Sequence, residues 1–162
     1  MHKQLGFTLI ELVVTVVIVA ALLLTSASLT NSWIDRSQVA SAKANFETAL
    51  LQAKTLALRN HNNQPFSEPA VSLCVDSNDD KINIIQLGTN AANPCDIAGN
   101  ALLKSFSIAK GITITQGNSP VECLTVNALG MLMYPLGSSC INNFTLAFNI
   151  EKNNESIPVS LL

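Results

Sequence analysis

The sequence has few charged residues and few aromatic ones. Charged side chains make up 12% of the 162 residues and aromatic side chains 5%, whereas 48% are hydrophobic. Because soluble domains usually carry about 25% charged residues, part of this chain is expected to lie in lipid or against other protein. Only nine Lys and Arg residues are present and the net charge is -2, so no basic field is available to gather nucleic acid.

Glycine and proline are absent between Phe7 and Gln64, although the chain contains seven Gly and six Pro. This absence predicts one unbroken helix from Phe7 to about Asn60. Such a helix would be about 80 Å long, more than twice the thickness of a bilayer core of about 30 Å. Half of it must therefore leave the membrane.

Residues 7–29 form an apolar segment, long enough to span a bilayer, whose only charge is Glu11. The preceding residues 1–6 carry Lys3, which is expected to stay in the cytoplasm. A secretory signal cleaved near Ala27 is the alternative. Glu11 argues against it, because a carboxylate in an apolar span costs roughly 2.5–3.5 kcal/mol and needs a partner. A discarded signal has no use for one.

The second half of the predicted helix is amphipathic. Apolar residues recur at steps of three and four, and charged residues fall mostly between them, which predicts a helix laid on a globular core. The apolar positions are Val39, Ala42, Phe46, Ala49, Leu50, Ala53, Leu56 and Ala57, and the charged ones are Arg36, Lys43, Glu47, Lys54 and Arg59. Trp33 follows the apolar segment closely enough to be an interfacial anchor.

After the helix the pattern changes to short runs with period two, separated by Gly and Asn. Residues 70–75 and 81–87, with a turn-rich segment between them, predict a β-hairpin. Further strands are predicted at 102–108, 111–116, 121–126, 131–134, 144–150 and 157–161. Strands without intervening helices predict an antiparallel sheet packed on the external half of the helix, which is an α+β fold.

Four cysteines follow the apolar segment and so lie on the exported side: Cys74, Cys95, Cys123 and Cys140. An even number in that compartment predicts two disulfides. Zinc is the weaker interpretation, because no pair has CxxC spacing and His2 and His61 lie far away. Sequence order favours Cys74 with Cys95 and Cys123 with Cys140 only weakly among three pairings, so the pairing stays open.

Enzymatic and metal chemistry find little support. Ser138 and Ser139 lie beside Cys140, but no histidine follows in the β region to act as a base. Asp76, Asp79 and Asp80 lack the Gly and distal Glu of a calcium loop, and a polar hairpin turn explains them. We expect neither a catalytic site nor a cofactor or metal.

The residues GFTLIE, from Gly6 to Glu11, behind a short leader with a Lys, resemble the class III signal of type IV pilins and pseudopilins. The resemblance implies that a prepilin peptidase cuts between Gly6 and Phe7 and methylates the new amine of Phe7. A buried carboxylate one turn deeper needs a cation, so Glu11 is expected to pair with the Phe7 amine, either that of its own helix, four residues away, or that of a neighbouring subunit in a bundle. Such a buried pair specifies register more than it adds stability.

The resemblance also implies a domain plan and a location. Residues 1–6 would be the leader, 7–29 the transmembrane and assembly helix, and 30–162 the globular pilin domain, with an amphipathic helix at 30–60 and a β-rich part at 66–162. The protein would cross the bacterial inner membrane once, with its N-terminus cytoplasmic and its globular part periplasmic. It would then enter a pilus or pseudopilus beside other minor and major pilins.

Residues 42–60 and 70–78 are similar to the FimT and FimU minor pilins and to the H-class pseudopilin of type II secretion. Major pilins commonly carry a helix-breaking Pro near the position of Ser28, which this chain lacks. We therefore expect a minor pilin that primes or caps assembly at the tip of a pilus used for adhesion and twitching motility. An H-class pseudopilin is the alternative.

A third interpretation is DNA capture, which FimT-like members carry out with an arginine-containing motif near the C-terminus. The matching residues 148–162 contain no arginine, and Lys152 lies between Glu151 and Glu155. Three other lysines, Lys81, Lys104 and Lys110, are scattered as on an ordinary solvated surface. DNA is therefore a partner that the sequence does not favour.

Overall fold

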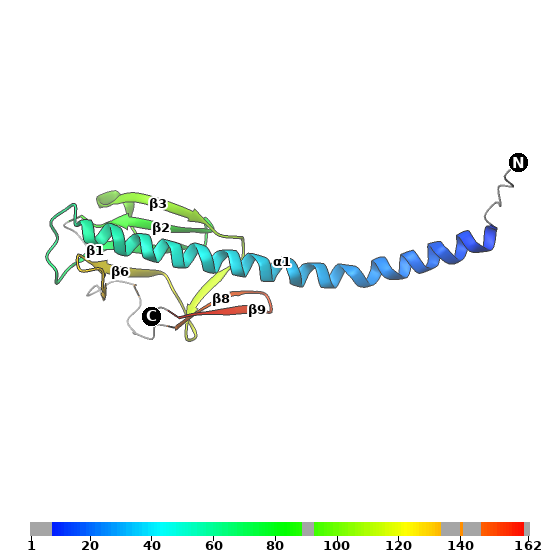
Figure 1. Ribbon diagram of the computed structural model, residues 1–162. Coiled ribbons are helices and arrows are strands. Elements are labelled where there is room, and N and C mark those ends of the chain that lie inside the picture. The colour runs from blue at the N-terminus through cyan, green and yellow to red at the C-terminus, as the bar shows by residue number, and fades with distance from the viewer. Residues whose placement is uncertain (1–7, 89–92, 134–139, 141–146, 161–162) are drawn as a thin grey trace, which may run out of the picture. The chain divides into compact units, whose positions relative to one another are not determined.

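The computed structural model describes residues 8–88, 93–133, 140 and 147–160, without the side chains of residues 24–29 and 98. It forms two compact units, Met1–Asp35 and Arg36–Leu162. Figure 1 labels most of the elements. They are α1 (Leu9–Arg59), β1 (Pro69–Asp76), β2 (Lys81–Gln86), the 3-10 helix η1 (Ile97–Gly99), β3 (Ala101–Ser107), β4 (Thr113–Gln116), β5 (Ser119–Pro120), β6 (Cys123–Asn127), β7 (Leu132–Met133), β8 (Ala147–Lys152) and β9 (Glu155–Ser160).

The helix α1 is continuous over 51 residues, as the lack of Gly and Pro predicts. It begins at Leu9, two residues later than expected, because Thr8 adopts a non-helical conformation. It ends where Asn60 turns to a φ of 39°, the left-handed conformation that commonly closes helices. The Asn60 side chain fixes this end, since its Oδ1 accepts from the Gln64 amide at 2.7 Å and its Nδ2 donates to the Gln64 carbonyl at 2.9 Å.

The eight predicted strands are present as β1 to β4 and β6 to β9, and the first two form the expected hairpin, whereas the two-residue β5 was not predicted. β1 and β2 pair antiparallel from Val71 with Gln86 to Asp76 with Lys81. The predicted strands at 131–134 and 144–150 lie partly outside the described residues, and β7 and β8 are the parts that the structure describes. The short η1 was not predicted.

The expectation of one sheet is wrong. The strands form a five-stranded sheet A, in the order β3-β2-β1-β6-β7, and a four-stranded sheet B, in the order β5-β4-β8-β9. Every pairing is antiparallel. The division arises because β4 pairs with β8, placing Ile114 opposite Ile150, and not with its chain neighbour β3. Period two predicts which residues share a face, but it does not predict the partner of a strand.

Within the unit Arg36–Leu162, α1 packs against both sheets, which is the arrangement of a type IV pilin fold (Figure 1). Sheet B meets the earlier turns, where the Phe46 and Phe148 ring centroids lie 5.5 Å apart. Sheet A lies along the turns that follow (Figure 1), beginning at Asn45, whose Nδ2 donates to the Ser107 carbonyl at the end of β3 at 3.0 Å. The predicted core face is confirmed: Val39, Ala42, Phe46, Ala49, Leu50, Ala53 and Ala57 are buried, and Leu56 is half-buried.

Two disulfides cover the face of sheet A that carries the cysteines of β1 and β6. They join Cys74 to Cys95 and Cys123 to Cys140, the pairing that sequence order favours. Cys74 and Cys123 are register partners, and both are buried in a small cluster with Ile85 and Cys140. The first six residues of β1 and all of β6 are accordingly buried. The predicted disulfide bonds are thus confirmed, and each ties a loop to a central strand.

Candidate assembly site at the helix N-terminus

The described part of the unit Met1–Asp35 is a helix with an uncovered apolar surface. Every large apolar side chain between Leu9 and Leu23 is exposed, from 49% at Val13 to 81% at Leu9. Exposed apolar surface of this extent marks a region that contacts lipid or protein. Trp33, at 73% exposure, lies on the same unit, and its role as an interfacial anchor stays a prediction.

Glu11 closes a capping box with Thr8 at the start of α1. Thr8 donates from its backbone N–H to Glu11 Oε2 at 3.1 Å and from its hydroxyl to the same oxygen at 2.9 Å. In return the Glu11 N–H donates to Thr8 Oγ1 at 3.4 Å. This reciprocal arrangement satisfies helix N–H groups that have no partner within the helix. A carboxylate in the first turn is also stabilised by the helix dipole.

Thr15, the next polar side chain in the apolar run, is satisfied by its own helix. Its hydroxyl donates to the Leu12 carbonyl at 2.9 Å. Polar groups in an apolar environment are costly unless hydrogen-bonded. Thr8, Glu11 and Thr15 therefore all have partners within their own chain.

The role of Thr8 was missed at the level of sequence. A Thr followed by Glu three residues later, just before an apolar run, is the signature of a capping box. The only role predicted for Glu11 from the sequence is to pair with an amine. Gly6 and Phe7 lie outside the described residues, so the peptidase and methylation sites stay predictions, as does the pairing of Glu11 with a neighbouring subunit.

The other clusters weighed from the sequence have structural roles. Asp76 Oδ1 accepts from the backbone N–H groups of Asn78 and Asp79 at 3.0 and 3.2 Å, which holds the turn between β1 and β2. Within the described ranges no group of His, Cys, Asp and Glu is arranged to hold a metal ion. Ser138 and Ser139 lie outside those ranges.

Three of the four lysines considered for DNA have local partners. Lys81 Nζ lies 3.6 Å from Asp79 Oδ2, and Lys104 Nζ lies 4.9 Å from the centre of the Phe106 ring. Lys152, beside the missing arginine motif, donates to Gln38 Oε1. No lysine cluster follows from these contacts.

Comparison with known families finds one match, at the N-terminus of the chain. Residues 1–27 match the family model of the prokaryotic N-terminal methylation motif. No curated protein and no solved structure matches the chain significantly. In the part of the chain that the structure describes, no helix is both long and apolar enough to cross a bilayer.

The methylation motif covers Gly6, Phe7 and the capping box, and the fold behind it is a helix packed on antiparallel sheets. The motif is consistent with processing by a prepilin peptidase and with a membrane-anchored protein. It indicates a structural subunit and not an enzyme. Motif and fold together support a type IV pilin-like protein, in the general class of pilins and pseudopilins.

Proposed function

We propose that this chain is a minor type IV pilin, a structural subunit that primes or caps the pilus at its tip. The observation that carries the proposal is the methylation motif at the start of a helix whose apolar side chains are uncovered. Such a helix has two suitable environments, the bilayer before assembly and a bundle of like helices afterwards. On this proposal residues 7–29 are the membrane and assembly helix, and 30–162 form the periplasmic globular domain.

The peptidase cut between Gly6 and Phe7 leaves the capping box intact. All three hydrogen bonds of the box join Thr8 and Glu11, so removing residues 1–6 breaks none of them. The cut adds an ammonium on Phe7, which the enzyme then methylates. The mature helix thus starts with a cation followed by a capped carboxylate.

Glu11 has different requirements during membrane insertion and during assembly. A carboxylate in the apolar span costs roughly 2.5–3.5 kcal/mol by insertion scales. The capping box gives the carboxylate two hydrogen-bond donors within a single subunit, which offsets part of that cost. A neighbour's amine is therefore not needed for insertion. Its role is to set the axial register of the next subunit in the filament.

The uninterrupted helix supports a minor rather than a major subunit. α1 runs from Leu9 to Arg59 without a break, and no proline lies near Ser28 to start melting of the helix. The similarity of residues 42–60 and 70–78 to FimU and FimT points the same way. On this proposal the protein is the first or last subunit of a filament and is not repeated along its length.

Replacing Glu11 with alanine tests the proposal. We expect Glu11→Ala to insert and fold its globular unit, because its core and disulfides lie within Arg36–Leu162. We expect the variant to be lost from sheared pili, since the register pair is gone. The control is Glu47→Ala, which removes an exposed carboxylate 3.8 Å from Lys43 Nζ on the amphipathic half of α1 and should leave incorporation unchanged.

Two results would contradict the proposal. Normal amounts of Glu11→Ala in sheared pili would remove Glu11 from the assembly mechanism. Wild-type protein that is absent from pili but present in a secretion pseudopilus would identify the H-class alternative.

A further inference from the structure

The strand β3 is an open edge of sheet A. It is the terminal strand of the order β3-β2-β1-β6-β7, and no other strand of the described chain pairs with its outer side. Six of its seven residues are exposed, including Leu102 at 46% and Leu103 at 40%. An exposed edge presents unpaired N–H and C=O groups, which another extended chain can pair with.

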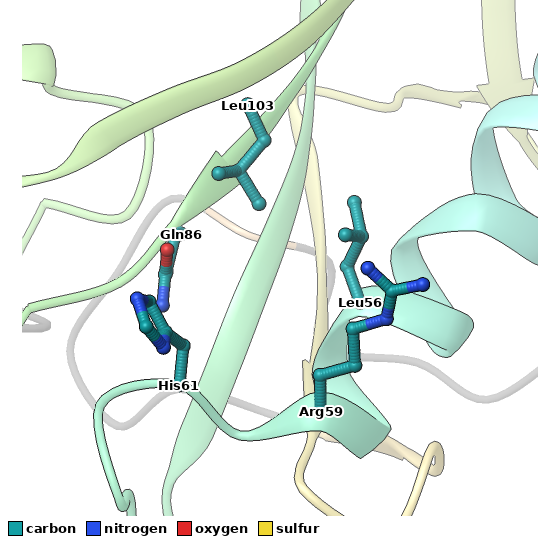
Figure 2. A pocket seen from close by; sticks show the side chains of 5 residues that line it. All are labelled: Leu56, Arg59, His61, Gln86 and Leu103. Carbon is teal, nitrogen blue, oxygen red and sulfur yellow. The ribbon is translucent and has the colours of Figure 1, made fainter.

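A hollow of about 270 Å³ lies beside this edge, between α1 and the sheet. Figure 2 shows its lining: Leu56 and Arg59 from α1, His61 from the segment after it, Gln86 from β2 and Leu103 from β3. Sites for small molecules usually enclose about 300–1,000 Å³, so this hollow suits a single amino-acid side chain better. Two of its lining residues, Leu56 and Leu103, are apolar and suit the aliphatic part of such a side chain.

The polar groups of the hollow favour a carboxylate. Arg59 and His61 supply donors and Gln86 supplies an amide, whereas no acidic residue lines the hollow. No residue of the described chain forms an ion pair with Arg59. Arginine is the side chain best suited to hold a carboxylate, with two parallel hydrogen bonds.

The edge disfavours a second copy of this chain. Lys104 is the middle residue of β3, so an antiparallel pairing of two copies centred on it would bring the two lysines face to face. Like charges placed directly opposite each other destabilise a strand pair, and edge lysines protect sheets in this way. A strand that places an acidic residue opposite Lys104 is instead attracted to the edge.

We propose that β3 is a docking edge: an extended segment of a different protein adds as a strand along β3 and places an Asp or Glu side chain against Arg59 and His61. Backbone hydrogen bonds to β3 supply affinity, and the hollow selects the acidic residue. DNA is the less favoured occupant, because it needs neither a strand edge nor leucine walls. This inference is independent of the filament role proposed above.

Photo-crosslinking in cells of the native host tests the docking edge. A photoreactive amino acid replaces Leu103 in the full-length chain, and mass spectrometry identifies the residue to which it links. The matched control carries the same amino acid at Ser156, an exposed residue of β9, the terminal strand of sheet B, which contains Pro158. We expect a link from position 103 to a chain that has an Asp or Glu within a few residues, and none from position 156.

A charge reversal then tests the recognition. We expect Arg59→Glu to lower the crosslink yield about fivefold, the equivalent of one exposed ion pair at the upper end of its range. Replacing the partner's acidic residue with Lys should restore the yield. Lys54→Glu, the same charge change earlier on α1, should have no effect, which separates recognition from helix stability.

Four results would overturn the proposal: no crosslink above the control, a link to a second copy of this chain, a product digested by nuclease, or a yield unaffected by Arg59→Glu. The incorporation of the same variants into sheared pili is measured in parallel. A chain that enters pili without the crosslink would contradict the docking edge and leave the filament role intact.

Discussion

At the residue scale, Glu11 has one partner in the single subunit and another in the proposed filament. In the single subunit, Glu11 accepts two hydrogen bonds from Thr8 at 2.9 and 3.1 Å. In the proposed filament it takes the Phe7 amine of a neighbour. The exchange is favourable because the amine brings a positive charge to the carboxylate, whereas the Thr8 donors are neutral. Thr8 therefore acts before assembly and Glu11 at both stages.

Removing the Thr8 hydroxyl should loosen the first turn of α1. We expect Thr8→Ala to destabilise that turn by about 1 kcal/mol, the usual cost of losing an N-cap. Amide hydrogen exchange of the full chain in detergent micelles would report this as exchange at Glu11 about fivefold faster. Thr8→Ser should keep the wild-type rate, because serine caps equally well.

Thr15→Ala is the matched control for that measurement. In the described part of the chain its hydroxyl bonds to the Leu12 carbonyl and to no group of the capping box, so its loss should leave the first turn unchanged. Equal exchange at Glu11 in Thr8→Ala and wild-type protein would show that the capping box does not stabilise the helix.

At the element scale, the later half of α1 depends on small residues. Ala42, Ala49, Ala53 and Ala57 are almost completely buried, so the sheets approach the helix closely. Enlarging one of them must displace a strand or force a strained rotamer, which costs typically 1–3 kcal/mol in a packed core. In this region α1 is held by its packing against the sheets.

A larger side chain should destabilise the fold at a buried alanine of α1 and have little effect at an exposed one. We expect Ala53→Leu to lower the free energy of unfolding by about 2 kcal/mol. The control Ala44→Leu introduces the same side chain on the exposed face of α1 and should stay within about 0.5 kcal/mol of wild type. Denaturant unfolding of the full chain in detergent measures both, and similar values for the two would contradict the close packing of α1 on the sheets.

The two disulfides should contribute about equally. Their cysteines are separated by 21 and 17 residues, so loop closure assigns each about 3 kcal/mol. Both cysteines of a bridge must be replaced by alanine together, because Cys74 and Cys123 are register partners and could otherwise join. Denaturant unfolding of the two double variants checks this, and a difference of more than about 2 kcal/mol between them would contradict it.

The sequence predicted what depends on local pattern. The helix end at Asn60, the buried face from Val39 to Ala57 and the β1–β2 hairpin all follow from neighbouring residues. The division into two sheets does not, because the pairing of β4 with β8 joins residues far apart in the chain. The hollow beside Leu103 was also unpredictable, since its lining residues come from α1, the segment after it, β2 and β3, which only the fold brings together. The capping box was readable, but Thr8 was overlooked.

At the scale of the whole molecule, the chain consists of a helix unit with uncovered apolar side chains and a globular unit with its own core and two disulfides. The first unit carries the methylation motif and the second carries the open edge of sheet A. On the two proposals above, assembly and partner recognition belong to separate parts of the protein. Variants of one part should leave the function of the other unchanged.

The central claim is that the apolar N-terminal segment is retained after processing and serves in assembly. Mass spectrometry of the mature protein, purified from the pilus fraction, tests this most directly. The account predicts an N-terminus at Phe7 that carries one methyl group on its amine, with Glu11 and the rest of the segment present. A mature chain that begins near Ser28, with the apolar segment removed, would contradict it.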